Sequence, residues 1–89
     1  MNAIITVIGK DQVGIIAMVC NILAEHNINV LDINQTIMQD TFTMIMLVDM
    51  TGLTSSYQAA DGALKAAGES KGLTIQIQRK EIFDAMHKV

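Results

Sequence analysis

The chain is 89 residues long with a formal net charge of −3, and 51% of its residues are hydrophobic. This length suits one domain, which we expect to span residues 1–89, and the high apolar fraction argues against intrinsic disorder. Six cationic side chains, no more than two of them adjacent, argue against nucleic-acid binding, and the single cysteine, Cys20, excludes both an intrachain disulfide and a site of four thiolates.

The first half of the chain predicts a strand, a helix and a hairpin. Residues 3–8 are rich in Ile, Val and Thr, which favours a strand, and residues 9–14 interrupt it. Residues 13–26 carry apolar side chains at helical spacing in two rows, so this helix is expected to be covered on more than one side. Residues 30–39 alternate and residues 42–50 follow after a short polar break, which indicates an antiparallel hairpin.

The two strands of this hairpin differ in their pattern. In the first, Leu31, Ile33 and Ile37 are expected on one face, with the polar residues between them on the other. The second is apolar on both faces, which is unusual for a sheet with one face in water. We therefore expect the terminal helix or another subunit to cover part of its second face.

The second half predicts a softer helix, a strand and a short terminal helix. Ser55 followed by Gln58 resembles a capping box that opens the second helix, whose apolar stripe is thin: Tyr57, Ala60, Leu64 and Ala67. Gly62 and Gly68 each cost this helix about 1 kcal/mol relative to alanine. Gly72 is the expected end of the helix, residues 73–78 alternate as a half-buried strand, and residues 81–88 form the last helix.

This order of elements predicts an α+β fold of the ferredoxin-like βαββαβ type. Its two crossovers should be right-handed, which places two helices on one face of a four-stranded antiparallel sheet, with the short C-terminal helix added.

Motifs for catalysis are missing from the sequence. It has no Gly-x-Ser-x-Gly elbow, no Walker loop and no Gly-x-Gly-x-x-Gly. Cys20 falls on the expected buried row of the first helix, whereas a catalytic thiol needs an accessible, electropositive setting. His26 and His87 are too few for a metal site unless Asp residues or a second chain contribute. We expect no enzymatic activity, no catalytic residues, no metal ligands and no cofactor.

The segment from Gly9 to Ile15, between the first strand and the first helix, is the most informative one. Asp11 or Gln12 stands where a helix N-cap acceptor is useful, and Gly14 lets another backbone or a ligand come close. The unpaired N–H groups of a helix N-terminus suit a carboxylate, and Asp11 suits an ammonium group. Two readings follow: recognition of both charged ends of a free amino acid, or an ordinary capped loop with a packing glycine.

Over essentially its whole length, the chain resembles the ACT domain, a small regulatory ligand-binding module. The resemblance is carried by GKDQVGIIAMVCNILAEHNINVLDINQTIMQDTFTMIMLVDM, in which Asp-x-x-Gly precedes an apolar helix and Asn-Ile-Asn-Val-Leu-Asp-Ile precedes the hairpin. The ending, residues 81–87, is similar to that of a subgroup of stand-alone single-domain ACT proteins, the UPF0237-like proteins.

The resemblance implies a binding site between subunits. ACT domains pair side by side or face to face, and amino acids or related small molecules often bind at the interface. The corresponding residues here are a loop, Lys10, Asp11, Gln12, Val13 and Gly14, and opposite it a turn, Asn27, Ile28 and Asn29. The two Asn side chains would supply donors and acceptors to the ligand, or alternatively they serve a left-handed turn at the helix end.

The resemblance and the residues together predict a non-enzymatic regulatory or sensor module. We expect a homodimer or a tetramer that binds an amino-acid-like ligand between subunits and alters contacts with another protein. The alternatives are a protein-interaction module without a small ligand, and a metal-dependent activity built from two chains.

The N-terminus lacks a basic segment and its apolar run ends at Asp11, which does not fit a signal peptide. No apolar stretch reaches the roughly 18 residues of a membrane span. We therefore expect a cytoplasmic protein without a membrane partner.

Overall fold

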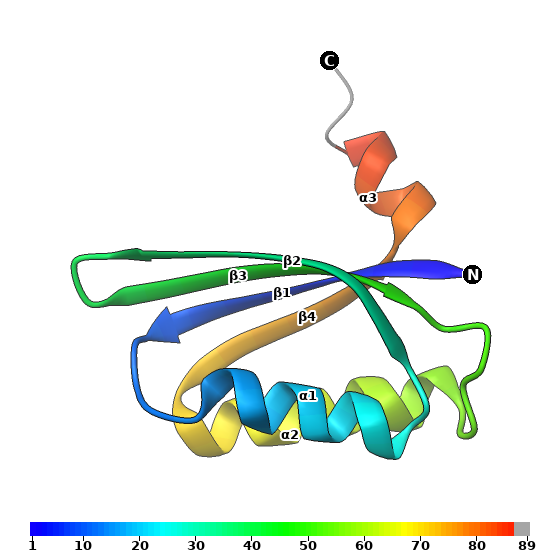
Figure 1. The fold of residues 1–89 in the computed structure, drawn as a ribbon, viewed down its shortest axis with the longest axis horizontal. Coiled ribbons are helices and arrows are strands. Elements are labelled where there is room, and N and C mark those ends of the chain that lie inside the picture. Colours follow the sequence, from blue (N-terminus) through cyan, green and yellow to red (C-terminus); the bar gives the residue numbers. More distant parts are fainter. Residues whose placement is uncertain (87–89) are drawn as a thin grey trace.

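The computed structural model describes residues 1–86 and contains four strands and three helices in the order β-α-β-β-α-β-α. They are β1 (Asn2–Lys10), α1 (Ile15–Glu25), β2 (Asn29–Met38), β3 (Thr41–Asp49), α2 (Tyr57–Lys71), β4 (Leu73–Arg79) and α3 (Lys80–Met86). The sheet is antiparallel with the strand order β2-β3-β1-β4. Helices α1 and α2 lie on one face and α3 projects from the other, which confirms the predicted ferredoxin-like α+β fold (Figure 1). Residues 87 and 88 of the predicted last helix lie outside the described part.

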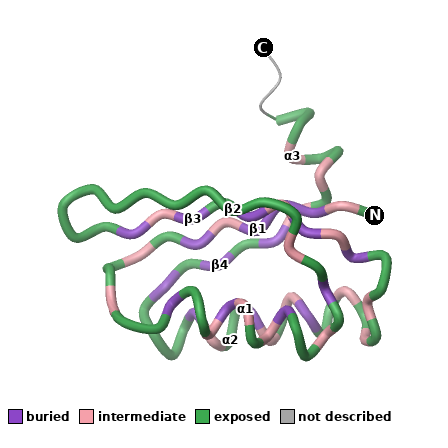
Figure 2. The backbone as a smooth tube through the Cα atoms, viewed as in Figure 1, coloured by how far each residue is buried: buried purple, intermediate pink, exposed green. Residues whose placement is uncertain are grey.

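The hydrophobic core lies between the sheet and the pair of helices α1 and α2 (Figure 2). Alternate residues of β3 point into it, and Met44, Met46 and Val48 are fully buried. Helix α1 contributes Ile15, Val19 and Leu23, and α2 contributes Ala60, Leu64 and Gly68. The predicted row for α1 is therefore partly wrong: Cys20, expected to be buried, is only half-buried. The buried residues of α1 are spaced by four from Ile15, and Cys20 lies one position round the helix from them.

The opposite face of the sheet is partly covered by α3. This helix contacts β1 and β4. Ile4, which alternates with the core residues of β1, is only 8% exposed, whereas Ile45 on β3 is 40% exposed. The terminal helix therefore covers the β1 side of this face and not the second face of β3, where the sequence analysis expected a cover, and the β3 side stays open within one chain.

Strand β2 is an edge of the sheet, and every residue from Leu31 to Met38 is exposed. The register places Ile33 opposite Met46 and Ile37 opposite Phe42, so these two isoleucines share one face, as predicted, and this face is the helix side. A β-bulge between Val30 and Asp32 takes Leu31 out of the ladder, which corrects the prediction that Leu31 continues the alternation.

The N-cap of α2 lies one residue later than predicted. Ser56 is the N-cap, and its hydroxyl accepts a hydrogen bond of 3.0 Å from the Ala59 N–H. Ser55 instead contacts Nδ1 of His26 at the end of α1, across 2.5 Å. Gly72 ends α2 with a φ of 70°, as predicted. Within residues 1–86, no helix has the length and apolar character needed to cross a membrane.

Candidate functional site

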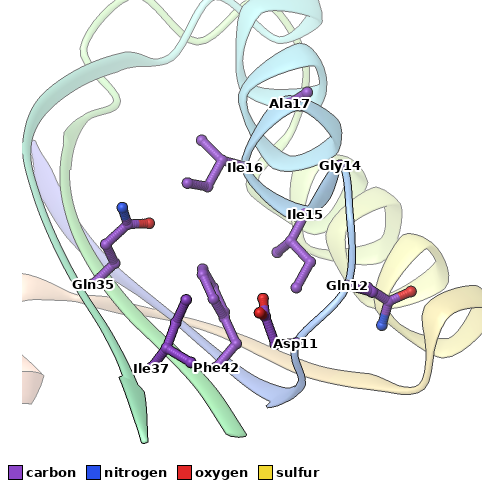
Figure 3. A pocket seen from close by; sticks show the side chains of 9 residues that line it. All are labelled: Asp11, Gln12, Gly14, Ile15, Ile16, Ala17, Gln35, Ile37 and Phe42. Carbon is purple, nitrogen blue, oxygen red and sulfur yellow. The ribbon is translucent and has the colours of Figure 1, made fainter. Parts of the chain in front are cut away.

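A cavity of about 370 Å³ lies between the start of α1 and the helix-side face of the β2–β3 hairpin (Figure 3). We call it the hairpin cavity. Its lining combines the predicted loop with residues from both hairpin strands: Asp11, Gln12, Gly14, Ile15, Ile16, Ala17, Gln35, Ile37 and Phe42. The loop and the hairpin are far apart in sequence, so this cavity is a product of the fold.

The N-terminus of α1 faces this cavity without a side-chain cap. Gly14 is the N-cap, with a φ of 92°, and no side chain accepts a hydrogen bond there. The prediction that Asp11 or Gln12 caps the helix is therefore wrong. Because a helix leaves its first N–H groups unpaired, they are available to an anionic group. The Asp11 side chain points into the same space (Figure 3).

Hydrogen bonds from two of its residues, Asp11 and Gln12, hold the loop between β1 and α1 in place. The Gln12 side-chain amide donates hydrogen bonds to the carbonyls of Lys10 (3.2 Å) and Lys71 (3.0 Å), and in Figure 3 it points towards α2 rather than into the cavity. The backbone N–H of Asp11 donates to the Asp40 carbonyl in the hairpin turn (2.8 Å). Lys10 and Val13 are exposed and do not line the cavity. The loop therefore holds Asp11 in place, and Gln12 acts as its anchor.

The predicted turn residues line a second cavity of about 410 Å³ at the other end of α1. We call it the turn cavity; its lining is Ala24, Asn27, Ile28, Asn29, Asp49 and Gly52. Asn27 has a φ of 57°, and its side-chain amide donates to the Gly52 carbonyl (2.8 Å), which supports the turn reading of this residue. Ile28 is 5% exposed and belongs to the core. Asn29 is exposed.

The two groups of predicted site residues do not meet within one chain. Helix α1 has 11 residues, which corresponds to a length of about 16 Å. The loop lies at its start and the turn at its end (Figure 1). A site that uses both groups therefore requires two copies of the chain.

Asp49, at the edge of the turn cavity, holds the beginning of the chain. Its carboxylate accepts hydrogen bonds from the Thr51 hydroxyl (2.6 Å) and the Thr51 N–H (3.0 Å), and the Met1 ammonium lies 3.8 Å away. These two hydrogen bonds, with a smaller contribution from the ammonium group, lower the pKa of Asp49 below its ordinary value.

This lowered pKa predicts a pH-dependent contribution to stability. A carboxyl group whose pKa is lower in the folded state stabilises the fold above its unfolded pKa of about 4, and the contribution is lost as the pH falls through the folded pKa. We expect Asp49→Asn to flatten the acid limb of a stability profile measured by thermal unfolding between pH 2 and pH 7. Thr51→Val, which removes the stronger donor, should give a smaller change in the same direction. An unchanged acid limb in Asp49→Asn would contradict this assignment.

Residues 1–86 contain no group of three or more His, Cys, Asp or Glu side chains placed to hold a metal ion. His87 lies outside the described residues. His26 contacts Ser55 and its carbonyl accepts a hydrogen bond from the Thr54 N–H (3.2 Å). The sequence places His26 at the end of the predicted helix, but these contacts could not be predicted from it, because they depend on a loop almost thirty residues away.

Comparisons with known proteins agree with the resemblance. A family model described as an ACT domain matches residues 2–78. A UPF0237 protein of Clostridium acetobutylicum is 54% identical over 89 residues, which is 100% of both chains. The structure of an ACT domain protein from Streptococcus pneumoniae is similar with a TM-score of 0.80 and 37% identity over 94% of each chain. The regulatory subunit of aspartate kinase from Thermus thermophilus is similar with a TM-score of 0.66 and 30% identity, over 86% of this chain and 50% of the other.

Proposed function

Because the chain belongs to the ACT domain family, we propose that it is a non-enzymatic regulatory module that binds a small amino-acid-like ligand between two copies of itself. ACT domains are commonly regulatory ligand-binding modules. The similar aspartate kinase structure is that of a regulatory subunit in a ligand-free form, which supports a regulatory role for this fold.

The chemistry of the hairpin cavity suits the two charged ends of an amino acid. The uncapped N-terminus of α1 offers N–H groups and a partial positive charge to a carboxylate. Asp11 points into the same cavity and offers a carboxylate to an ammonium group. One ligand with both groups would satisfy both ends of the site.

The single observation that carries the proposal is the course of β2. This strand begins at the turn cavity, with Asn29, and reaches the hairpin cavity at Ile37, along the uncovered edge of the sheet. If two β2 strands pair antiparallel, the start of each lies beside the end of the other. Such a pairing brings the turn cavity of one copy towards the hairpin cavity of its partner and unites the two predicted groups of site residues.

The edge itself favours such a pairing. Soluble proteins normally protect an exposed edge strand with charge, proline or a covering element. Here β2 is ten residues long and carries Leu31, Ile33 and Ile37, which are 48%, 40% and 54% exposed. Ile16 on the neighbouring α1 is 38% exposed. A second copy would remove these apolar side chains from water and complete the hydrogen bonds of the edge.

The proposal predicts a ligand-dependent increase in thermal stability. In melts with each of the twenty amino acids, we expect one or a few to raise the melting temperature by several degrees, because a ligand that binds only the folded state stabilises it. Asp11→Ala and Asn29→Ala should each abolish this rise, while light scattering across a dilution series should show that the dimer is intact. A rise that persists in both variants would contradict this placement of the site.

A protein-interaction module without a small ligand is the second candidate. It is favoured by the structural bonds of Gln12 and Asn27, which explain two of the predicted site residues without a ligand. The edge of β2 would then accept a strand from a partner protein. A melting temperature that does not respond to any amino acid, together with an intact dimer, would favour this candidate.

A further inference from the structure

The hairpin cavity has an apolar half formed by four side chains. Ile15 and Phe42 are 4% and 3% exposed and form its floor, whereas Ile16 and Ile37 are 38% and 54% exposed. They come from α1 and from both strands of the hairpin, and in Figure 3 they surround one space. A ligand side chain in this space would be in contact with hydrocarbon from several directions.

The polar side chains that line the cavity also disfavour a charged ligand side chain. Asp11 is the one ionisable side chain among its nine lining residues, and Gln35 and Gln12 are the others with a polar side chain. Gln12 points away, so Gln35 is the neutral polar group left beside the apolar half (Figure 3). An acidic ligand side chain would face Asp11 without a lysine or arginine to pair with it. A basic side chain would place its charge among isoleucines, at a high cost in desolvation.

We infer that the ligand of this cavity is an α-amino acid with a neutral aliphatic side chain, of the class of leucine, isoleucine, valine and methionine. The inference rests on the proposed function and specifies its ligand. The ammonium group lies at Asp11, the carboxylate lies at the start of α1, and the aliphatic side chain fills the space between Ile16, Ile37 and Phe42.

Calorimetric titration of the full chain with single compounds tests this ligand class. We expect leucine, isoleucine, valine or methionine to bind at least about tenfold more tightly than alanine, because removing methyl and methylene groups from an apolar pocket weakens binding by that order. Aspartate, glutamate and lysine should bind more weakly still. Leucinamide, which lacks the carboxylate, and 4-methylpentanoate, which lacks the amine, should both lose binding.

A pair of matched variants tests the placement of the side chain. Ile37→Ser should weaken the binding of the best aliphatic ligand about tenfold more than that of alanine, and light scattering checks that the dimer through β2 is intact. Ile82→Ser, an exchange of an isoleucine of similar exposure (48%) on α3, should leave both unchanged. Far-ultraviolet circular dichroism and a thermal melt confirm that each variant is folded.

The outcomes separate the two proposals. Tighter binding of aspartate, glutamate or lysine than of any aliphatic amino acid would overturn the inferred ligand class and leave the proposed function standing. The same loss of affinity in Ile37→Ser and Ile82→Ser would overturn the placement of the side chain. If no amino acid binds, the proposed function itself fails, and the inferred ligand class fails with it.

Discussion

Leu64→Ala should lower the free energy of unfolding by about 2–5 kcal/mol, the range seen when a buried leucine is truncated and its cavity is not refilled. Leu64 is 1% exposed on α2. The other buried residues of this helix are Ala60 and Gly68, so Leu64 is the one large side chain that α2 places fully in the core. Domains of this size have a total stability of about 5–15 kcal/mol, and the loss is a large part of it.

Chemical unfolding in urea, followed by circular dichroism, measures this loss. Lys65→Ala is a suitable control, because it changes the next residue of the same helix without touching the core. The Lys65 side chain is 58% exposed and pairs with the half-buried Asp61 at 3.1 Å, and such a pair on one helix face is worth about 0.3–0.5 kcal/mol. A loss below about 1 kcal/mol in Leu64→Ala would mean that α2 contributes far less to the core than its burial indicates.

The sequence was sufficient to predict the fold because hydrophobic periodicity changes cleanly between elements. In β4, Leu73, Ile75 and Ile77 are buried and alternate with polar residues, as predicted from their spacing of two. In α1 the apolar residues at helical spacing placed the helix correctly. Two crossovers of this kind leave few topologies, since the connections must be right-handed.

Such patterns do not predict contacts between segments that are far apart in the sequence. The side chain of Gln12 fits an N-cap by its position, yet it bonds to Lys71, 59 residues away. Ser55 fits a capping box, yet it contacts His26, and Ser56 caps the helix. In both cases a local rule competed with a tertiary contact, and the sequence does not contain the geometry that decides between them.

In the candidate site, too, a local feature was predicted and residues from distant segments were not. The loop with Asp11 was predicted from its position between a strand and a helix, but Gln35, Ile37 and Phe42 were not included. Ile37 and Phe42 face each other in the hairpin, so they lie together on the helix side of the sheet. The register of this hairpin was the signal that would have placed these two residues on one face. The position of the start of α1 over that face depends on how the helix packs on the sheet.

The two glycines of α2 show how packing reverses a local preference. Both were predicted to weaken the helix, and at Gly62 the structure leaves room for an alanine, because a Cβ at this position has no neighbour within 4 Å. At Gly68 a Cβ would lie 2.8 Å from the Leu73 carbonyl oxygen and 3.0 Å from Cγ1 of Ile75. Gly68 is therefore the point at which α2 approaches β4 closely, and the backbone atom in its way cannot rotate aside.

Gly62→Ala and Gly68→Ala should therefore change stability in opposite directions. The first should raise the free energy of unfolding by up to about 1 kcal/mol, because alanine has the higher helix propensity. The second should lower it by about 1–3 kcal/mol, the usual cost of overpacking, since α2 must move away from β4. Urea unfolding of the two variants beside the unchanged chain measures both effects with the same exchange in the same helix. Stabilisation by Gly68→Ala would show that the contact between α2 and β4 yields to a methyl group without cost.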